Sequence, residues 1–181
     1  MEHRDDLALA RRARLVYESA RLRRAIVRAW PVPLAAWLAV RLGTSPSHVV
    51  VLAIPLAIAA IVLVWRGGVT GRAVAPGLAA GAAPLIAPGL AMDCAVACSA
   101  SCQTWCATSC VVGGILAGSL IGYRASRVGH GGWQFAATAV AIAATTGAMG
   151  CAMAGAMGVT GMLIGLAAGA VPVFALVPRR S

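Results

Sequence analysis

Long uncharged segments dominate the chain beyond residue 34, and short arginine-bearing segments separate them. Val49–Trp65 carries 17 uncharged residues, close to the roughly 20 that an α-helix needs to cross a bilayer. Ala73–Ala91 and Val111–Tyr123 predict two further spans. Phe135–Val177 holds 43 uncharged residues, and one helix of that length would measure about 65 Å, roughly twice the hydrocarbon thickness. This last segment therefore predicts two helices joined by a tight turn near Gly155–Gly158.

Prolines interrupt two of these segments. Pro55 predicts a kink in the first span. The second span holds Pro76, Pro84 and Pro88, and lipid tolerates the carbonyls that prolines free only where neighbouring helices or water satisfy them. We therefore expect the second span to lie inside a helix bundle.

The pattern is different at the start of the chain, where residues 4–29 predict an amphipathic helix. Apolar side chains share one stripe and arginines cover much of the remaining surface. The stripe residues are Leu7, Leu15, Leu22, Ile26 and Ala29. Pro31 and Pro33 end this helix, and Trp30 and Trp37 are placed to anchor at the membrane interface. Residues 1–34 are thus expected to form a basic juxtamembrane helix, or alternatively a solvated charged tail, before a transmembrane domain of residues 35–181.

Composition supports a membrane protein with close helix packing. Apolar residues make up 60% of the chain and aromatic residues only 5%, so small aliphatic residues and glycine fill the segments. A soluble helix bundle needs charged outer faces, but Asp93 is the only charge between Arg72 and Arg124. Small residues spaced for close helix contact occur in the third span, at Gly113, Gly114 and Gly118. The expected fold is an all-α polytopic bundle of about five spans, with four to six possible.

The charge of the chain is polarised. All 15 basic residues are arginines, and nine of them lie at or before Arg41. This bias predicts a cytoplasmic N-terminus in a bacterial inner membrane, without a cleavable signal peptide. A basic segment on a membrane domain faces anionic lipid headgroups more often than nucleic acid. Five spans would place Arg179 and Arg180 outside, whereas four or six would place them inside.

The segment Met92–Cys110 contains the most unusual chemistry in the chain. Five cysteines follow each other at intervals of four: Cys94, Cys98, Cys102, Cys106 and Cys110. On a helix each step advances about 40°, so the thiols form a stripe that covers about 160° of the surface. Thiolates favour soft ions such as Cu(I), or Zn. A second helix must contribute ligands, because one helix cannot wrap a tetrahedral ion with consecutive thiols.

A second set of sulfur atoms lies further along the chain. Met149, Met153 and Met157 are also spaced by four, with Cys151 between them and Met162 nearby. A thiol stripe that faces a thioether stripe would suit Cu(I). The alternative is that these side chains only pack, since cysteine and methionine also serve as ordinary core residues. Asp93 is the only candidate catalytic residue, because an ionisable group at membrane depth is costly to bury; a helix cap is its alternative role.

Residues 38 to about 133 resemble the CDP-alcohol phosphatidyltransferase family, membrane enzymes that join a phosphoalcohol to a lipid. The run RLGTSPSHVVVL, Arg41–Leu52, is similar to the entry into the family's first helix. MDCAVACSAS, Met92–Ser101, places Asp93 and Ala100 at two positions of the family's Asp-x-x-Asp-Gly-x-x-Ala-Arg motif. SRVGHG, Ser126–Gly131, is similar to the segment after the family's last aspartate. A basic amphipathic helix before the first span completes the resemblance.

The chain departs from that family where the catalytic metal would bind. Val96, Ala97 and Ser101 replace the motif's second aspartate, glycine and arginine, and no aspartate follows Asp93. The resemblance implies divalent-metal catalysis held by carboxylates, and one aspartate cannot supply those ligands. We therefore expect a non-catalytic binding or accessory protein. A Cys/Met-lined site for a soft metal, a homo-oligomer and a small structural subunit of a membrane complex remain as alternatives.

Overall fold

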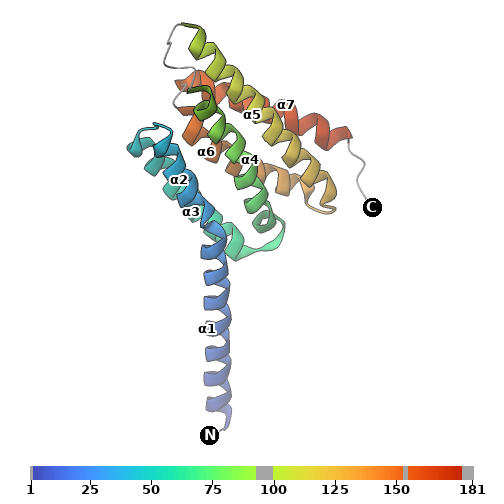
Figure 1. Ribbon diagram of the computed structural model, residues 1–181. Helices are drawn as coiled ribbons and strands as arrows, with labels where there is room; N and C mark the ends of the chain where they lie inside the picture. Colours follow the sequence, from blue (N-terminus) through green and yellow to red (C-terminus); the bar gives the residue numbers. More distant parts are fainter. Residues whose placement is uncertain (1, 93–99, 153–154, 177–181) are drawn as a thin grey trace.

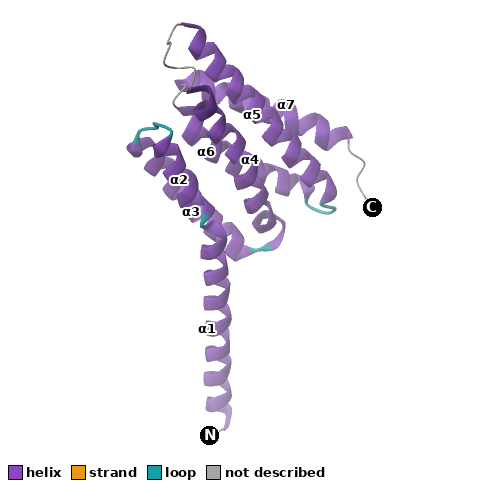
Figure 2. Ribbon diagram, viewed as in Figure 1, coloured by secondary structure: helices purple, strands orange, loops and turns teal. Residues whose placement is uncertain are grey.

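A computed structural model of the chain describes residues 2–92, 100–152 and 155–176, with side chains at 11–87, 107–152 and 155–176. These residues are helical apart from short connections and contain no strand (Figure 2). In chain order the helices are α1 (Glu2–Ala29), α2 (Pro31–Arg41), α3 (Pro46–Arg66), α4 (Gly68–Met92), α5 (Ala100–Arg127), α6 (Gly132–Cys151) and α7 (Gly155–Leu176). The expected all-α fold is confirmed.

Helices α2 to α7 lie side by side, and α1 projects from one end of the bundle (Figure 1). Within the described residues four helices are long and apolar enough to cross a membrane: Pro46–Arg66, Gly68–Ala87, Gly132–Cys151 and Gly155–Leu176. The chain is therefore an integral membrane protein by its architecture. Helix α5 packs along α7 and α4 and carries no charge from Ala100 to Tyr123, which supports a fifth span.

Glycines bring neighbouring helices into backbone contact. Gly114 and Gly118 of α5 face the carbonyls of Met162 and Leu166, and Gly165 of α7 faces the carbonyl of Val111. Residue numbers rise together on both helices, so α5 and α7 are parallel. Gly77 and Gly81 of α4 contact α6 in the same way. The predicted close-packing role of Gly114 and Gly118 is confirmed, and these faces are used inside the chain.

The helix ends differ from expectation by a few residues. The 43-residue apolar segment does form two helices, but α6 ends at Cys151 and α7 starts at Gly155, slightly before the expected turn. Gly155 has a φ of +68°, a left-handed conformation that costs glycine little. Helix α1 ends before Pro31 as expected, yet Pro31 also starts α2, because proline's fixed φ suits the first position of a helix.

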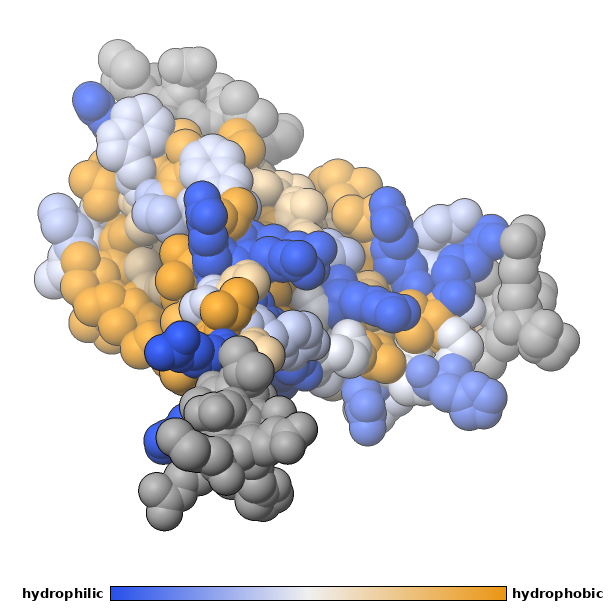
Figure 3. Space-filling model, turned by 90° about the horizontal axis from the view of Figure 1, so that it is seen from below, coloured by the Kyte–Doolittle hydropathy of each residue, from blue (hydrophilic) through white to orange (hydrophobic). Residues whose placement is uncertain are grey.

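Two turns with arginine lie at the end of the bundle from which α1 projects, whereas Arg41 borders the α2–α3 turn at the opposite end. Arg66 and Arg72 flank the α3–α4 turn, and Arg124 and Arg127 precede the α5–α6 turn. The Arg21 guanidinium donates a hydrogen bond of 2.8 Å to the carbonyl of Arg66, which fixes the last part of α1 beside the end of α3. Figure 3, viewed from this end, shows hydrophilic residues gathered from the centre to the right of the face, beside a hydrophobic area on its left. We call this surface, which carries Arg66, Arg72, Arg124 and Arg127, the arginine face.

Candidate functional site

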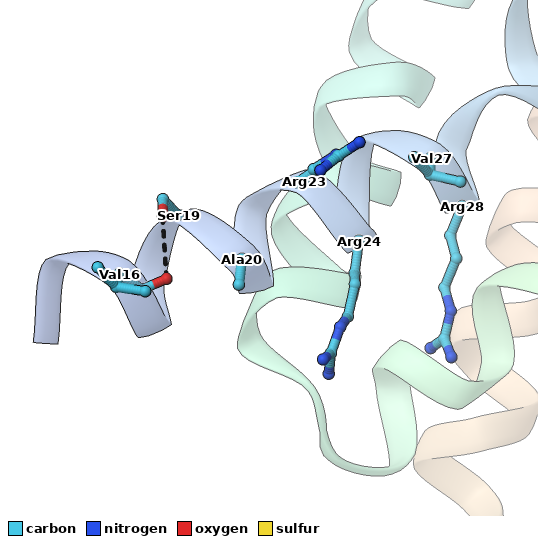
Figure 4. Close-up of a pocket in the computed structure, with 7 residues that line it drawn as sticks. All are labelled: Val16, Ser19, Ala20, Arg23, Arg24, Val27 and Arg28. Carbon is cyan, nitrogen blue, oxygen red and sulfur yellow. Dashed lines mark hydrogen bonds between the residues drawn. The ribbon is translucent and has the colours of Figure 1, made fainter. Parts of the chain in front are cut away.

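The inner part of α1 borders an open hollow on the arginine face. Its volume is about 630 Å³, and its lining residues all come from one side of α1: Val16, Ser19, Ala20, Arg23, Arg24, Val27 and Arg28. Figure 4 shows that Arg24 and Arg28, one helical turn apart, extend from α1 in the same direction. Two guanidinium groups therefore border one hollow.

Arg28 also belongs to a second hollow, an apolar groove between α2 and α4 of about 350 Å³. Leu34, Ala35 and Leu38 of α2 form one wall of this α2–α4 groove. The opposite wall comes from α4: Ala75, Leu78, Ala79, Ala82, Leu85 and Ile86. Arg28 and Thr146 are the polar side chains that line it, and Arg28 lies at the end near the arginine face. The hollow and the groove thus meet at one arginine.

The arginines of this site have no carboxylate neighbour among the described side chains. Glu18 is the only carboxylate there, and it pairs with Arg14 at 2.9 Å. Arg23, Arg24 and Arg28 are exposed, and none of them has a described carboxylate partner. Such guanidinium groups can form paired hydrogen bonds to a phosphate.

A second group of reactive side chains lies deep in the bundle. Cys110 of α5 and Cys151 of α6 have no solvent exposure, and their thiols are hydrogen-bonded to each other. The Cys151 thiol also donates to the carbonyl of Pro84 in α4 at 3.6 Å. That carbonyl lacks its helical partner because residue 88 is a proline without an N–H. The Cys110 thiol of α5 therefore interacts with a thiol of α6, and the other four cysteines of the thiol stripe have no described side chain.

Methionine from a fourth helix completes this group. Met162 of α7 is fully buried and shares one core cluster with Cys110 and Cys151. Its carbonyl packs against Gly114, one turn from Cys110, and its sulfur packs against Gly147, one turn from Cys151. Four helices thus contribute to this part of the core: Cys110, Cys151 and Met162 share one cluster, and the Cys151 thiol bonds to the Pro84 carbonyl of α4.

The other sulfur residues expected at a metal site do not join this group in the described chain. Met149 is buried in the other core cluster and Met157 is 68% exposed. The two methionines do not share one stripe, because the break between α6 and α7 separates them. Four candidates lie outside the described residues: Asp93, Cys94, Cys98 and Met153. Cys102 and Cys106 lie on α5, but their side chains are outside the description.

Sequence reasoning did not find the groove or the pairing of Cys110 with Cys151. The spacing of Pro84 and Pro88 was a usable signal, since it leaves one carbonyl in need of a donor from another helix. Among the described residues no group of three or more His, Cys, Asp or Glu side chains could hold a metal ion. No family model, no curated protein and no solved structure matches the chain.

Proposed function

We propose that the chain is a non-catalytic phospholipid-binding or accessory protein of the membrane, similar in framework to the CDP-alcohol phosphatidyltransferases. The α2–α4 groove is the observation that carries the proposal, because this apolar groove ends at the exposed Arg28. An anionic phospholipid has the complementary chemistry, with a hydrocarbon chain joined to a phosphate. Its acyl chain occupies the groove and its phosphate lies between Arg24 and Arg28.

The length of the groove matches one leaflet of a bilayer. From Arg28 to Leu38 the nearly continuous helix rises about 15 Å, at 1.5 Å per residue. The hydrocarbon core of a bilayer is about 30 Å thick, so one leaflet supplies about 15 Å. An acyl chain about as long as one leaflet is thick can therefore lie along the groove with its phosphate at the end that Arg28 lines.

The carboxylate content supports a binding role over catalysis. Magnesium or manganese chemistry on a pyrophosphate needs several oxygen ligands from the protein. Asp93 is the only aspartate or glutamate beyond Glu18, and five cysteines follow it within 17 residues of sequence. The chain would then bind the class of lipid that the phosphatidyltransferases process, without converting it.

The proposal also includes an orientation in a bacterial inner membrane. Arg66, Arg72, Arg124 and Arg127 lie near turns at the end of the bundle from which α1 projects. Cytoplasmic loops carry an excess of arginine and lysine. The arginine face, with the N-terminus, is therefore cytoplasmic, and the lipid comes from the cytoplasmic leaflet.

Native mass spectrometry of the purified protein tests the proposal. The protein is delipidated in detergent and titrated with phosphatidylglycerol or phosphatidylcholine of identical acyl chains. We expect tighter binding of phosphatidylglycerol. Arg24→Gln with Arg28→Gln should weaken it about 30-fold, since each arginine contributes about 1 kcal/mol toward an anionic lipid and 1.4 kcal/mol is tenfold.

Two matched variants separate headgroup recognition from chain binding. Arg124→Gln with Arg127→Gln removes the same charge away from the groove and should leave phosphatidylglycerol binding close to wild type. Ala79→Trp fills the α2–α4 groove and should weaken binding of both lipids, because it blocks the chain but keeps the arginines. The proposal is contradicted if the wild type binds the two lipids equally and if neither Ala79→Trp nor the Arg24→Gln/Arg28→Gln variant weakens binding.

A further inference from the structure

We infer that Cys110, Cys151 and Met162 form a binding site for one soft monovalent cation, Cu(I). The inference is independent of the lipid proposal, because the thiol pair lies between α4, α5, α6 and α7 and the α2–α4 groove does not include it. It rests on two interacting thiols from α5 and α6 that are fully buried, and on a buried methionine of α7 in the same core cluster.

The ligands are brought together by packing and not by their spacing in the sequence. Cys110 and Cys151 are 41 residues apart, yet their thiols contact each other and neither is exposed to solvent. Met162 reaches the same cluster from α7, where its sulfur packs against Gly147 of α6. A side chain at Gly147 would displace this sulfur, so the glycine leaves room for the thioether one helical turn from Cys151.

The chemistry of this ligand set favours Cu(I). Thiolates and thioethers are soft ligands and select soft ions. Cu(I) is satisfied by two or three sulfur ligands, whereas structural zinc sites have four. Two thiols and one thioether therefore fit Cu(I) better than Zn.

The charge balance suits a site inside hydrocarbon. One S–H bond of the pair breaks and its proton leaves to solvent, while Cu(I) exchanges the ligands it arrived with for three Cu–S bonds, to the thiolate, the remaining neutral thiol and the thioether. The site is neutral before and after, so no net charge is buried, which would be costly in this environment. Cys151 is also the last residue of α6, and the partial negative charge at a helix C-terminus favours a cation.

Competition with a chromogenic Cu(I) chelator tests the inference on the full chain in detergent under reducing conditions. The first variant keeps the site alone, with serine at Cys94, Cys98, Cys102 and Cys106. The second variant removes it, with Cys110→Ala and Cys151→Ala. We expect the first to bind one Cu(I) per chain in competition with the chelator. The second should lose one Cu(I) relative to the wild type.

Two further measurements distinguish a metal site from a structural role of the thiols. Met162→Leu keeps the core volume and should weaken Cu(I) binding about tenfold while the thermal unfolding temperature stays close to wild type. X-ray absorption at the copper edge should show sulfur neighbours only. The inference is overturned if the first variant binds no Cu(I), or if the second, still folded by thermal unfolding, binds as much as the wild type.

Discussion

At the scale of single residues, glycine determines how closely the membrane helices approach. A Cβ atom at Gly118 would lie against the carbonyl oxygen of Leu166 and the backbone nitrogen of Ala170. Both neighbours are backbone atoms of α7, so they cannot rotate away as a flexible side chain could. Dispersion and close packing hold membrane helices together where lipid supplies no hydrophobic force. The missing side chain at this position is therefore a requirement of the α5–α7 contact.

Gly118→Ala is predicted to destabilise the protein by about 1–3 kcal/mol, the range found for overpacked cores. Alanine favours a helix over glycine by about 1 kcal/mol, so any net loss must come from the clash with α7. Thermal unfolding in detergent measures the effect. Gly129→Ala is the matched control, because a Cβ there meets no atom within 4 Å, and it should leave the unfolding temperature unchanged.

At the scale of elements, a turn at one end of the bundle supports the end of a distant helix. Thr44 lies between α2 and α3 and is buried, and its hydroxyl donates a 2.9 Å hydrogen bond to the carbonyl of Met149. Met149 belongs to the last turn of α6, where carbonyls have no partner within the helix. Thr44 therefore joins the α2–α3 hairpin to α6 across 105 residues of sequence.

Thr44→Val keeps the shape of this side chain and removes the donor. We predict a loss of about 1–3 kcal/mol in unfolding free energy, the cost of leaving a buried acceptor unsatisfied. Denaturation in detergent with increasing amounts of a denaturing detergent provides the comparison. Thr44→Ser retains the hydroxyl and should keep most of the stability, so equal losses in both variants would rule out the hydrogen bond as the cause.

Element type followed from the sequence more securely than element ends. Uncharged length alone predicts α3, α4, α6 and α7, because only a helix satisfies its own backbone inside lipid. The start of α2 was not predicted, since Pro31 was interpreted only as the end of α1. The pairing of Cys110 with Cys151 was also missed, because the four-residue spacing of thiols describes one helix and says nothing about which helix packs against it.

At the scale of the whole molecule, the directions of the helices indicate on which side of the membrane Arg179 and Arg180 lie. Residues 21–41 run beside α3 in the opposite direction, joined to it by the Arg21–Arg66 hydrogen bond at one end and the α2–α3 turn at the other. Both segments contain 21 residues. Since α5 and α7 are parallel, α7 ends at the same end of the bundle as Arg127.

This arrangement predicts that both chain ends lie on the arginine side. Reporter proteins that are active only in the cytoplasm or only outside it, fused after Ser181, measure the location. We expect cytoplasmic activity, in line with the arginine bias, although five spans counted from the sequence would place this end outside. Activity of the external reporter would show that residues 21–41 do not span the membrane.

The parallel pairing of α5 with α7 has a consequence for biosynthesis. The ribosome completes α5 and all of α6 before any of α7 exists, so α5 enters the bilayer ahead of its partner. During that interval the backbone at Gly114, Gly118 and Gly122 is not covered by α7 and is exposed to lipid or to a membrane chaperone at the insertion channel. Chains that end before residue 155 lack α7, so these three glycines stay exposed. Quality-control proteases could recognise this exposed surface, which complete molecules do not have.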